Sequence, residues 1–509
     1  MSLELFSSKN NNFNENYPLL IKKIKSKKLV ELEPKIDEIT AVTEIIKKFI
    51  IEKKWKIYGG YALHLLLLEK NKSIVIYEQD DIYDIDFYSP EPIIDLKELC
   101  DRIHTAGFKP VLGQEAQHKE TYSIYVNYQL YCDITYMPNN IYKKLRYMFL
   151  NNFLLVHPYF LMIDYYRMFV DPLGSFWRLE KHFERYMLLQ KYYPLPNTKE
   201  EIQLESYKDK NIYKFVTLLF NEIVNYESII FTGLYTYNYY LYLSEYAKNN
   251  KLYDYLKLPY QEVYSTNYVE DGLRILNFIK TLSQPFISKI VYVEYQPFFQ
   301  FYGNSTIFYY NCDGEHIPIL YLYENNKRSI PFKKFNLIKF KNNNQIEIIN
   351  KEINICSFDF SILHSLITLV KLRIDDEDAW NNIIYKYINN ITLFRNHYLE
   401  KFNKTIYDDS LFQSFVIECM GEYILPERQR RLLIEVRRKL GKPFIFKYEP
   451  QLNRTLGKFL FYNSSGNQIN NPKYLKLTEE NRNSNIMDEL EKNELLVETE
   501  EWKLIDKNK

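Results

Sequence analysis

Between residues 35 and 136 the apolar pattern switches repeatedly between the 3.6-residue period of a helix and the two-residue period of a strand. Helical spacing covers residues 35–53, 61–70 and 93–105. Short apolar runs predict strands at 55–58, 82–88, 122–127 and 129–136. This alternation restricts the region to an α/β (α+β) domain in which a sheet is covered by helices.

Composition narrows the class of protein. The 66 lysines and arginines balance 65 aspartates and glutamates, so the chain as a whole is nearly neutral. Aromatic residues make up 17% of the sequence, which argues against overall disorder. The five cysteines contain no CxxC pair, and we find neither a signal-peptide pattern nor an apolar run of roughly 18 residues. We therefore expect a soluble intracellular protein in a reducing compartment, without a membrane span.

Three aspartates lie in the predicted strands of the α/β region. Asp84 and Asp86 stand two residues apart in one strand, so their side chains project from the same face. Asp133 lies in a second strand and could supply a third carboxylate. Because adjacent carboxylates repel one another unless cations neutralise them, this arrangement predicts a site for hard divalent ions.

Gly59 and Gly60 follow a predicted strand and open a predicted helix. Their missing side chains would let a phosphate reach backbone N–H groups and the positive end of the helix. Taken singly, the aspartate pair also fits a solvated edge strand, and the glycine pair fits an ordinary turn. The order of these features, each in suitable secondary structure, favours a functional site.

The glycine pair and the three aspartates together resemble the polymerase-β-like nucleotidyltransferase superfamily. Its pattern is apolar-Gly-[Gly/Ser], then Asp-apolar-Asp-apolar, then apolar-Asp-apolar, and it covers about residues 55–136 here. Within that superfamily the chain is similar to the poly(A) polymerase catalytic subunits of large cytoplasmic DNA viruses, and most to the giant-virus type. The resemblance implies a nucleotidyltransferase fold with a mixed sheet and helical flanks.

The resemblance also implies the chemistry. Asp84, Asp86 and Asp133 would hold two Mg²⁺ or Mn²⁺ ions, and ATP would donate AMP to an RNA 3′ end, as in mRNA polyadenylation. Gly59 and Gly60 would contact the nucleotide. The giant-virus relatives suggest a homodimer in the host cytoplasm, at the viral factory, with packaging in the virion left open. The alternatives are a CCA-adding or oligoadenylate-type enzyme, or a catalytically silent RNA-binding scaffold.

A basic helical face follows the α/β region. Arg178, Lys181 and Arg185 fall at positions i, i+3 and i+7 of a predicted helix. They could meet the ATP triphosphate or primer phosphates, or form a solvated charged face, since Glu180 and Glu184 alternate with them.

Residues 228–241 and 263–279 resemble the segments around the glycine pair and the aspartate pair. In this alignment Ser265 and Asn267 replace Asp84 and Asp86. The similarity predicts a second, degenerate nucleotidyltransferase-like module without a metal site, with chance similarity as the alternative.

A further cluster of cations lies near the C-terminus. It could bind RNA phosphates or form the outer face of a helix. Its arginines are Arg428, Arg430, Arg431, Arg437 and Arg438.

We expect six regions along the chain. They are an N-terminal helical segment (1–50), the catalytic domain (51–150), a helical connector (151–200), the degenerate module (201–345), a mostly helical C-terminal region (346–462) and a polar tail (463–509).

Overall fold

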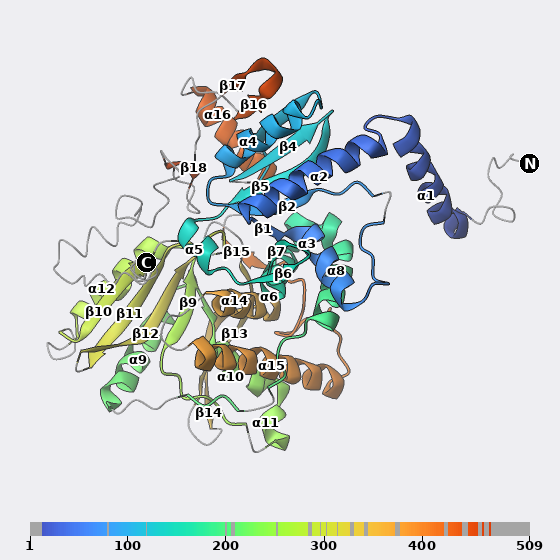
Figure 1. The fold of residues 1–509 in the computed structure, drawn as a ribbon. Coiled ribbons are helices and arrows are strands. Elements are labelled where there is room, and N and C mark those ends of the chain that lie inside the picture. The colour runs from blue at the N-terminus through green and yellow to red at the C-terminus, as the bar shows by residue number, and fades with distance from the viewer. Residues whose placement is uncertain are drawn as a thin grey trace, which may run out of the picture. The chain divides into compact units, whose positions relative to one another are not determined.

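The structure, a computed structural model, describes residues 13–469 with short gaps. The gaps are residues 79–80, 119, 199–200, 205–208, 251–252, 283–287, 296, 302, 313, 326–329, 341–344, 372–376, 422–425, 440–445, 457–460 and 463–467. The chain divides into two compact units (Figure 1), and each contains one mixed sheet. The first unit comprises residues 1–137, 147–156 and 431–458, and the second comprises 138–146, 157–430 and 459–509.

The first unit is built on a sheet with the strand order β17-β16-β3-β4-β5-β2-β1-β7-β6. Its strands are β1 (Lys56–Tyr58), β2 (Ile85–Ser89), β3 (Val111–Glu115), β4 (Thr121–Val126), β5 (Gln129–Tyr136), β6 (Tyr147–Leu150), β7 (Phe153–Val156), β16 (Lys447–Glu449) and β17 (Arg454–Leu456). Its helices are α1 (Phe13–Glu31), α2 (Ile36–Lys53), α3 (Gly59–Lys70), α4 (Pro92–Thr105) and the short η2 (Pro450–Leu452).

One face of this sheet is apolar and forms the core of the first unit. Ile57, Phe87 and Ile134 alternate with polar residues along β1, β2 and β5, and all three are fully buried. Helices α2 and α4 pack on this side of the central strands. The opposite face carries the side chains of alternate positions, among them Asp86 and Asp133.

The second unit repeats the topology of the first. Its sheet has the order β10-β11-β12-β9-β8-β14-β13-β15, which matches β3-β4-β5-β2-β1-β7-β6 strand for strand before the final β15. The pairing directions also match: β8 is antiparallel to β9 and parallel to β14, and β9 is parallel to β12. The strands are β8 (Ile229–Thr232), β9 (Gln261–Ser265), β10 (Ile290–Tyr295), β11 (Ser305–Cys312), β12 (Glu315–Glu324), β13 (Ile330–Phe340), β14 (Ile346–Cys356) and β15 (Cys419–Met420).

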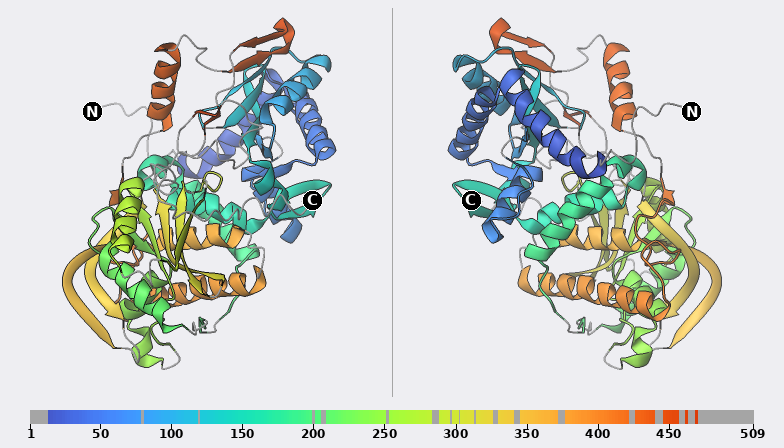
Figure 2. Two further views of the ribbon diagram at one scale, coloured as in Figure 1. Left: turned by 90° about the vertical axis from the view of Figure 1, so that its left-hand side faces the viewer. Right: turned by 90° about the vertical axis from the view of Figure 1, so that its right-hand side faces the viewer.

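The helices of the second unit complete the repeat. Helices α9 and α12 pack together and against β12, as α2 and α4 do on β5, and α10 follows β8 as α3 follows β1. Figure 2 shows β13 and β14 as the long amber strands that curve at one side of this unit. The helices are α5 (Asn139–Lys144), α6 (Pro158–Phe169), α7 (Pro172–Ser175), η1 (Phe176–Arg178), α8 (Leu179–Tyr192), α9 (Lys210–Ile223), α10 (Leu234–Ser244), α11 (Tyr246–Asn249), α12 (Tyr268–Lys280), α14 (Phe358–Val370) and α15 (Glu377–Lys401).

Two further elements lie toward the C-terminus. Helix α16 (Pro426–Lys439) contains a boundary of the division along the chain, between residues 430 and 431. Strand β18 (Phe461–Tyr462) pairs with β19 (Gln468–Ile469). Among the described residues, no helix combines the length and apolar character needed to cross a membrane.

Several elements differ from the sequence-based expectations. Phe153–Val156 is a strand although residues 151–200 were expected to be helical. Strand β14 also belongs to the second sheet, beyond the expected boundary at residue 345. The polar tail from residue 463 lies outside the described residues apart from 468–469. A four-residue apolar run such as Phe153–Val156 cannot be assigned by periodicity alone, because it fits a buried strand and a helix equally well.

Mutation can test the close packing of Gly233, the residue between β8 and α10. Its φ of +63° is unfavourable for other residues, and an added Cβ would lie 2.6 Å from Cδ of Glu262. Gly314 also has a positive φ of +89°, but no atom lies within 4 Å of an added Cβ. We expect Gly233→Ala to lower the free energy of unfolding by about 1–3 kcal/mol more than Gly314→Ala does. Urea unfolding of both variants measures this, and equal losses would contradict the close packing of Gly233 on β9.

Candidate active site

Strand register brings the three predicted carboxylates together. β2 lies between β1 and β5; Asp86 is paired with Tyr58 on one side and with Asp133 on the other. Paired residues on adjacent strands share a face of the sheet. Asp84 precedes β2 by one residue, outside the strand in which we had expected it. One carboxylate oxygen from each aspartate lies within 4.8 Å of the others, and all three side chains are half-buried.

The environment of Asp133 shows how the sheet holds these charges. The Ser123 hydroxyl, on the adjacent strand β4, donates a hydrogen bond of 2.6 Å to Oδ1 of Asp133. Burial raises the pKa of Asp133 to about 6, the Ser123 hydrogen bond opposes this, and the charge of Asp84 adds to the increase. A half-buried set of three carboxylates is the kind of ligand set that Mg²⁺ and Mn²⁺ prefer. The residues present therefore fit a divalent metal site.

A row of hydroxyl groups lies on the same face of the sheet. The Tyr58 hydroxyl is 2.7 Å from Oγ1 of Thr135, which is 2.9 Å from Oγ1 of Thr121. The Tyr58 ring stacks on Tyr88, with 4.0 Å between the ring centroids. Burial, with the negative charge of Asp86 as a second cause, raises the pKa of Tyr58 well above its ordinary value, so this hydroxyl stays protonated.

Sequence analysis missed Ser123, Tyr58 and Thr135. The two-residue alternation of the predicted strands places Thr135 on the face of Asp133, and that signal was available. Ser123 and Tyr58 could be located only once the register between strands was known, because sequence periodicity does not say which residues pair across a sheet.

Gly59 is the first residue of α3 and lies directly against Asp86. Its φ is +70°, and an added Cβ would clash with Oδ2 of Asp86 and lie 3.1 Å from its Cγ. Both the backbone conformation and the space therefore require glycine. Gly60 is the next residue of the same helix, so α3 begins at the residue that packs against Asp86. Such a terminus favours an anionic ligand.

The predicted cations belong to other elements. Arg178 lies in η1, and Lys181 and Arg185 are four residues apart in α8; all three are in the second unit, whereas the carboxylates are in the first. Arg428 and Arg431 are exposed on α16. Arg430, Arg437 and Arg438 fall on the same helix, but their side chains lie outside the described residues.

The second unit has no equivalent carboxylate cluster among its described residues. Register pairs Thr232 with Glu262 and Glu262 with Tyr321, so Glu262 and Tyr321 stand where the first unit has Asp86 and Asp133. By the same count Tyr260 replaces Asp84. The predicted substitutes Ser265 and Asn267 are therefore wrong by several residues.

Matching hydrogen bonds in the two units show which residues correspond to each other. Ser265 donates to Asp271 at 2.6 Å, as Ser89 donates to Asp95, and each serine accepts a hydrogen bond from the backbone two residues later. Ser265 thus corresponds to Ser89 and not to Asp84. The sequence alone misaligns the two segments, because polar residues at different positions interrupt a similar apolar pattern.

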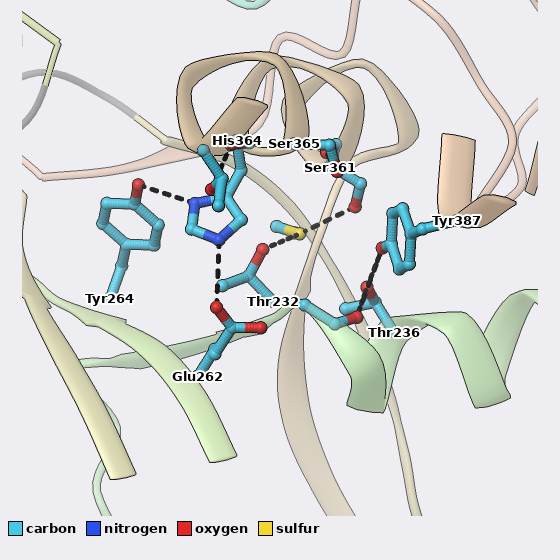
Figure 3. A network of polar contacts seen from close by, with 11 residues as sticks. Thr232, Thr236, Glu262, Tyr264, Ser361, His364, Ser365 and Tyr387 are labelled. Carbon is cyan, nitrogen blue, oxygen red and sulfur yellow. Dashed lines mark hydrogen bonds and ion pairs between the residues drawn. The ribbon is translucent and has the colours of Figure 1, made fainter. Parts of the chain in front are cut away.

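An imidazole faces the remaining carboxylate of the second unit. Nε2 of His364, on α14, lies 3.4 Å from Oε1 of Glu262, and its Nδ1 is 3.1 Å from the Tyr264 hydroxyl (Figure 3). Both partners of this contact are largely buried. The position that corresponds to the carboxylate site in the first unit is thus filled by side chains in the second.

The first unit's mixed sheet, its strand-Gly-Gly-helix junction and the three convergent carboxylates define a nucleotidyltransferase. The family model of the poly(A) polymerase catalytic subunit matches residues 44–175, and that of the C-terminal part of the APMV poly(A) polymerase catalytic subunit matches residues 187–479. The chain belongs to the poly(A) polymerase catalytic subunit family.

Individual relatives agree with this assignment. The poly(A) polymerase catalytic subunit of Acanthamoeba polyphaga mimivirus is 32% identical over 519 aligned residues, which cover 96% of this chain and 86% of that protein. An African swine fever virus protein of the same description is 33% identical over 165 residues, 31% of this chain and 34% of its own length. The crystal structure of the Megavirus polyadenylate synthase superposes with a TM-score of 0.77 at 32% identity, covering 94% of this chain and 96% of that one.

Replacement of a single carboxylate tests the site. We expect Asp84→Asn and Asp86→Asn each to lower nucleotide incorporation at least about 100-fold, because a metal ligand contributes several kcal/mol to charge stabilisation in the transition state. The metal-free variants should unfold no more easily than the wild type, since removing one negative charge relieves repulsion.

Glu91→Gln is the matched control, because Glu91 is an exposed acid two residues after β2. It should leave incorporation unchanged. Near-normal turnover of either aspartate variant in a primer-extension assay would show that these carboxylates are not the catalytic ligands.

Proposed function

We propose that this poly(A) polymerase transfers AMP from ATP to RNA 3′ ends at the site formed by Asp84, Asp86 and Asp133. The observation that carries the proposal is the convergence of the three carboxylates within 4.8 Å, on the polar face of the first sheet. The reaction needs no covalent enzyme intermediate, because ions and positioning suffice for phosphoryl transfer.

Two Mg²⁺ or Mn²⁺ ions are the proposed cofactors. Asp84 and Asp86 would hold both ions, and Asp133 would hold the one nearer the RNA 3′-hydroxyl. When bound, such ions make the hydroxyl a better nucleophile and neutralise charge on the transferring phosphate and the departing pyrophosphate.

Residues of the chain would orient these groups. Ser123 fixes one oxygen of Asp133 through its hydrogen bond, so the other oxygen keeps a defined direction. The hydrogen bond between the protonated Tyr58 hydroxyl and Thr135 would hold the strands beneath the carboxylates in register. The N-terminus of α3 at Gly59 and Gly60 would contact phosphate oxygens of ATP through backbone N–H groups.

The basic residues are proposed contacts for substrate phosphates. Arg178, Lys181 and Arg185 would bind the nucleotide or the primer. Arg428, Arg430, Arg431, Arg437 and Arg438 would bind RNA farther from the 3′ end, which agrees with the exposure of Arg428 and Arg431. A homodimer, action at a viral factory in the host cytoplasm and packaging in the virion are further proposals that rest on the resemblance to giant-virus enzymes.

A primer-extension assay tests the function directly. The chain is incubated with an RNA primer and each of the four ribonucleoside triphosphates in turn, with Mg²⁺ or Mn²⁺ and with a chelator as control. We expect long products with ATP alone and none with the chelator. Short products of fixed length would favour a CCA-adding activity, and no incorporation with any nucleotide would favour a silent RNA-binding scaffold.

A further inference from the structure

Two adjacent aromatic side chains project from the second unit. Phe176 is 72% exposed and Trp177 is 65% exposed, although large aromatic residues normally bury most of their surface. Contiguous exposed apolar side chains of this size indicate a surface that binds another molecule.

The segment that carries these rings is tightly held. The Ser175 hydroxyl lies 2.7 Å from the carbonyl oxygen of Met168 and 2.6 Å from that of Asp171. The Asp171 carboxylate accepts a hydrogen bond from the backbone N–H of Gly174, and Pro172 is buried at the start of α7. The backbone that leads into Phe176 and Trp177 is therefore held in place, which lowers the entropy lost when a ligand binds.

Two cations follow the aromatic pair in the chain. The Arg178 guanidinium lies over the Trp177 ring, 4.1 Å from its centroid, and the Lys181 side chain is exposed one turn later on α8. An aromatic face beside exposed cations matches the flat bases and charged backbone of single-stranded nucleic acid.

We propose that Phe176 and Trp177 form a stacking platform for unpaired RNA bases, with Arg178 and Lys181 placed beside it for the phosphates. This inference rests on the proposed function, in which single-stranded RNA is the substrate. Stacking on a π-face tolerates any base, so such a platform can hold a growing tail of adenosines.

The surface fits RNA better than a second copy of the chain. Two aromatic side chains bury about 150–250 Å² each, so the pair falls well below the roughly 800 Å² per partner of a stable protein interface. Lysine is depleted at the centres of protein interfaces, whereas the exposed Lys181 lies one turn after these rings.

Binding of a 15-nucleotide oligo(A), followed by fluorescence anisotropy, tests the platform. Trp177→Ala should weaken binding about 5- to 150-fold, the range found when one stacking aromatic is removed, and Phe176→Ala should act in the same direction. Trp177→Phe retains a π-face and should bind within about threefold of the wild type. For an abasic oligomer of equal length, Trp177→Ala should bind as the wild type does, because only phosphate contacts remain.

Leu173→Ala is the matched control, because it removes an exposed apolar side chain from the same turn without removing a π-face. It should leave oligo(A) binding unchanged. Equal effects of Leu173→Ala and Trp177→Ala, or a change of sedimentation from dimer to monomer with oligo(A) affinity unchanged, would overturn the proposal in favour of a protein interface.

Primer extension by the wild type separates this inference from the proposed function. A wild-type enzyme that extends oligo(A), together with a Trp177→Ala variant that binds oligo(A) normally, refutes the platform alone. Failure of the wild type to extend any RNA refutes the proposed function.

Discussion

The register of three strands is the constraint on which the rest of the first unit depends. β2 must lie between β1 and β5 with Asp86 opposite both Tyr58 and Asp133 for the carboxylates to share one face. A slip of one residue would turn these side chains toward α2 and α4, into the apolar core. The buried residues Ile57, Phe87 and Ile134 oppose such a slip, because it would expose them instead. The same hydrophobic pattern that stabilises the fold therefore fixes the position of the three carboxylates.

The two units show what this scaffold does with and without the carboxylates. Both have a glycine at positive φ that packs against an acidic residue, Asp86 in one case and Glu262 in the other. In the first unit two more aspartates join, and their mutual repulsion creates a demand for cations. In the second, tyrosines replace them and His364 faces the remaining carboxylate. In the second unit, side chains alone therefore occupy the position that corresponds to the carboxylate site, which agrees with a structural role for this module.

Sequence reasoning located most of the helices and strands of residues 36–136, because their alternating apolar periods mark them, but it missed β3 (Val111–Glu115). It also selected the three aspartates that the structure brings together, since their residue type and order limit the chemistry. It failed for Phe153–Val156, whose apolar run carries no period, and for the alignment of the second module, where Ser265 was equated with Asp84 instead of Ser89. The roles of Ser123 and Tyr58 depend on pairing across strands, which the sequence does not show. The exposure of Phe176 and Trp177, on which the proposed platform rests, is a property of the folded surface.

The central claim is that the carboxylates of the first unit hold catalytic metal ions and that the corresponding position of the second unit does not. Crystals soaked with Mn²⁺ and a non-hydrolysable ATP analogue, measured at the manganese absorption edge, test it most directly. We predict anomalous peaks bonded to oxygens of Asp84, Asp86 and Asp133, and none at Glu262. Manganese at Glu262, or its absence from the three aspartates while the nucleotide is bound, would contradict the account.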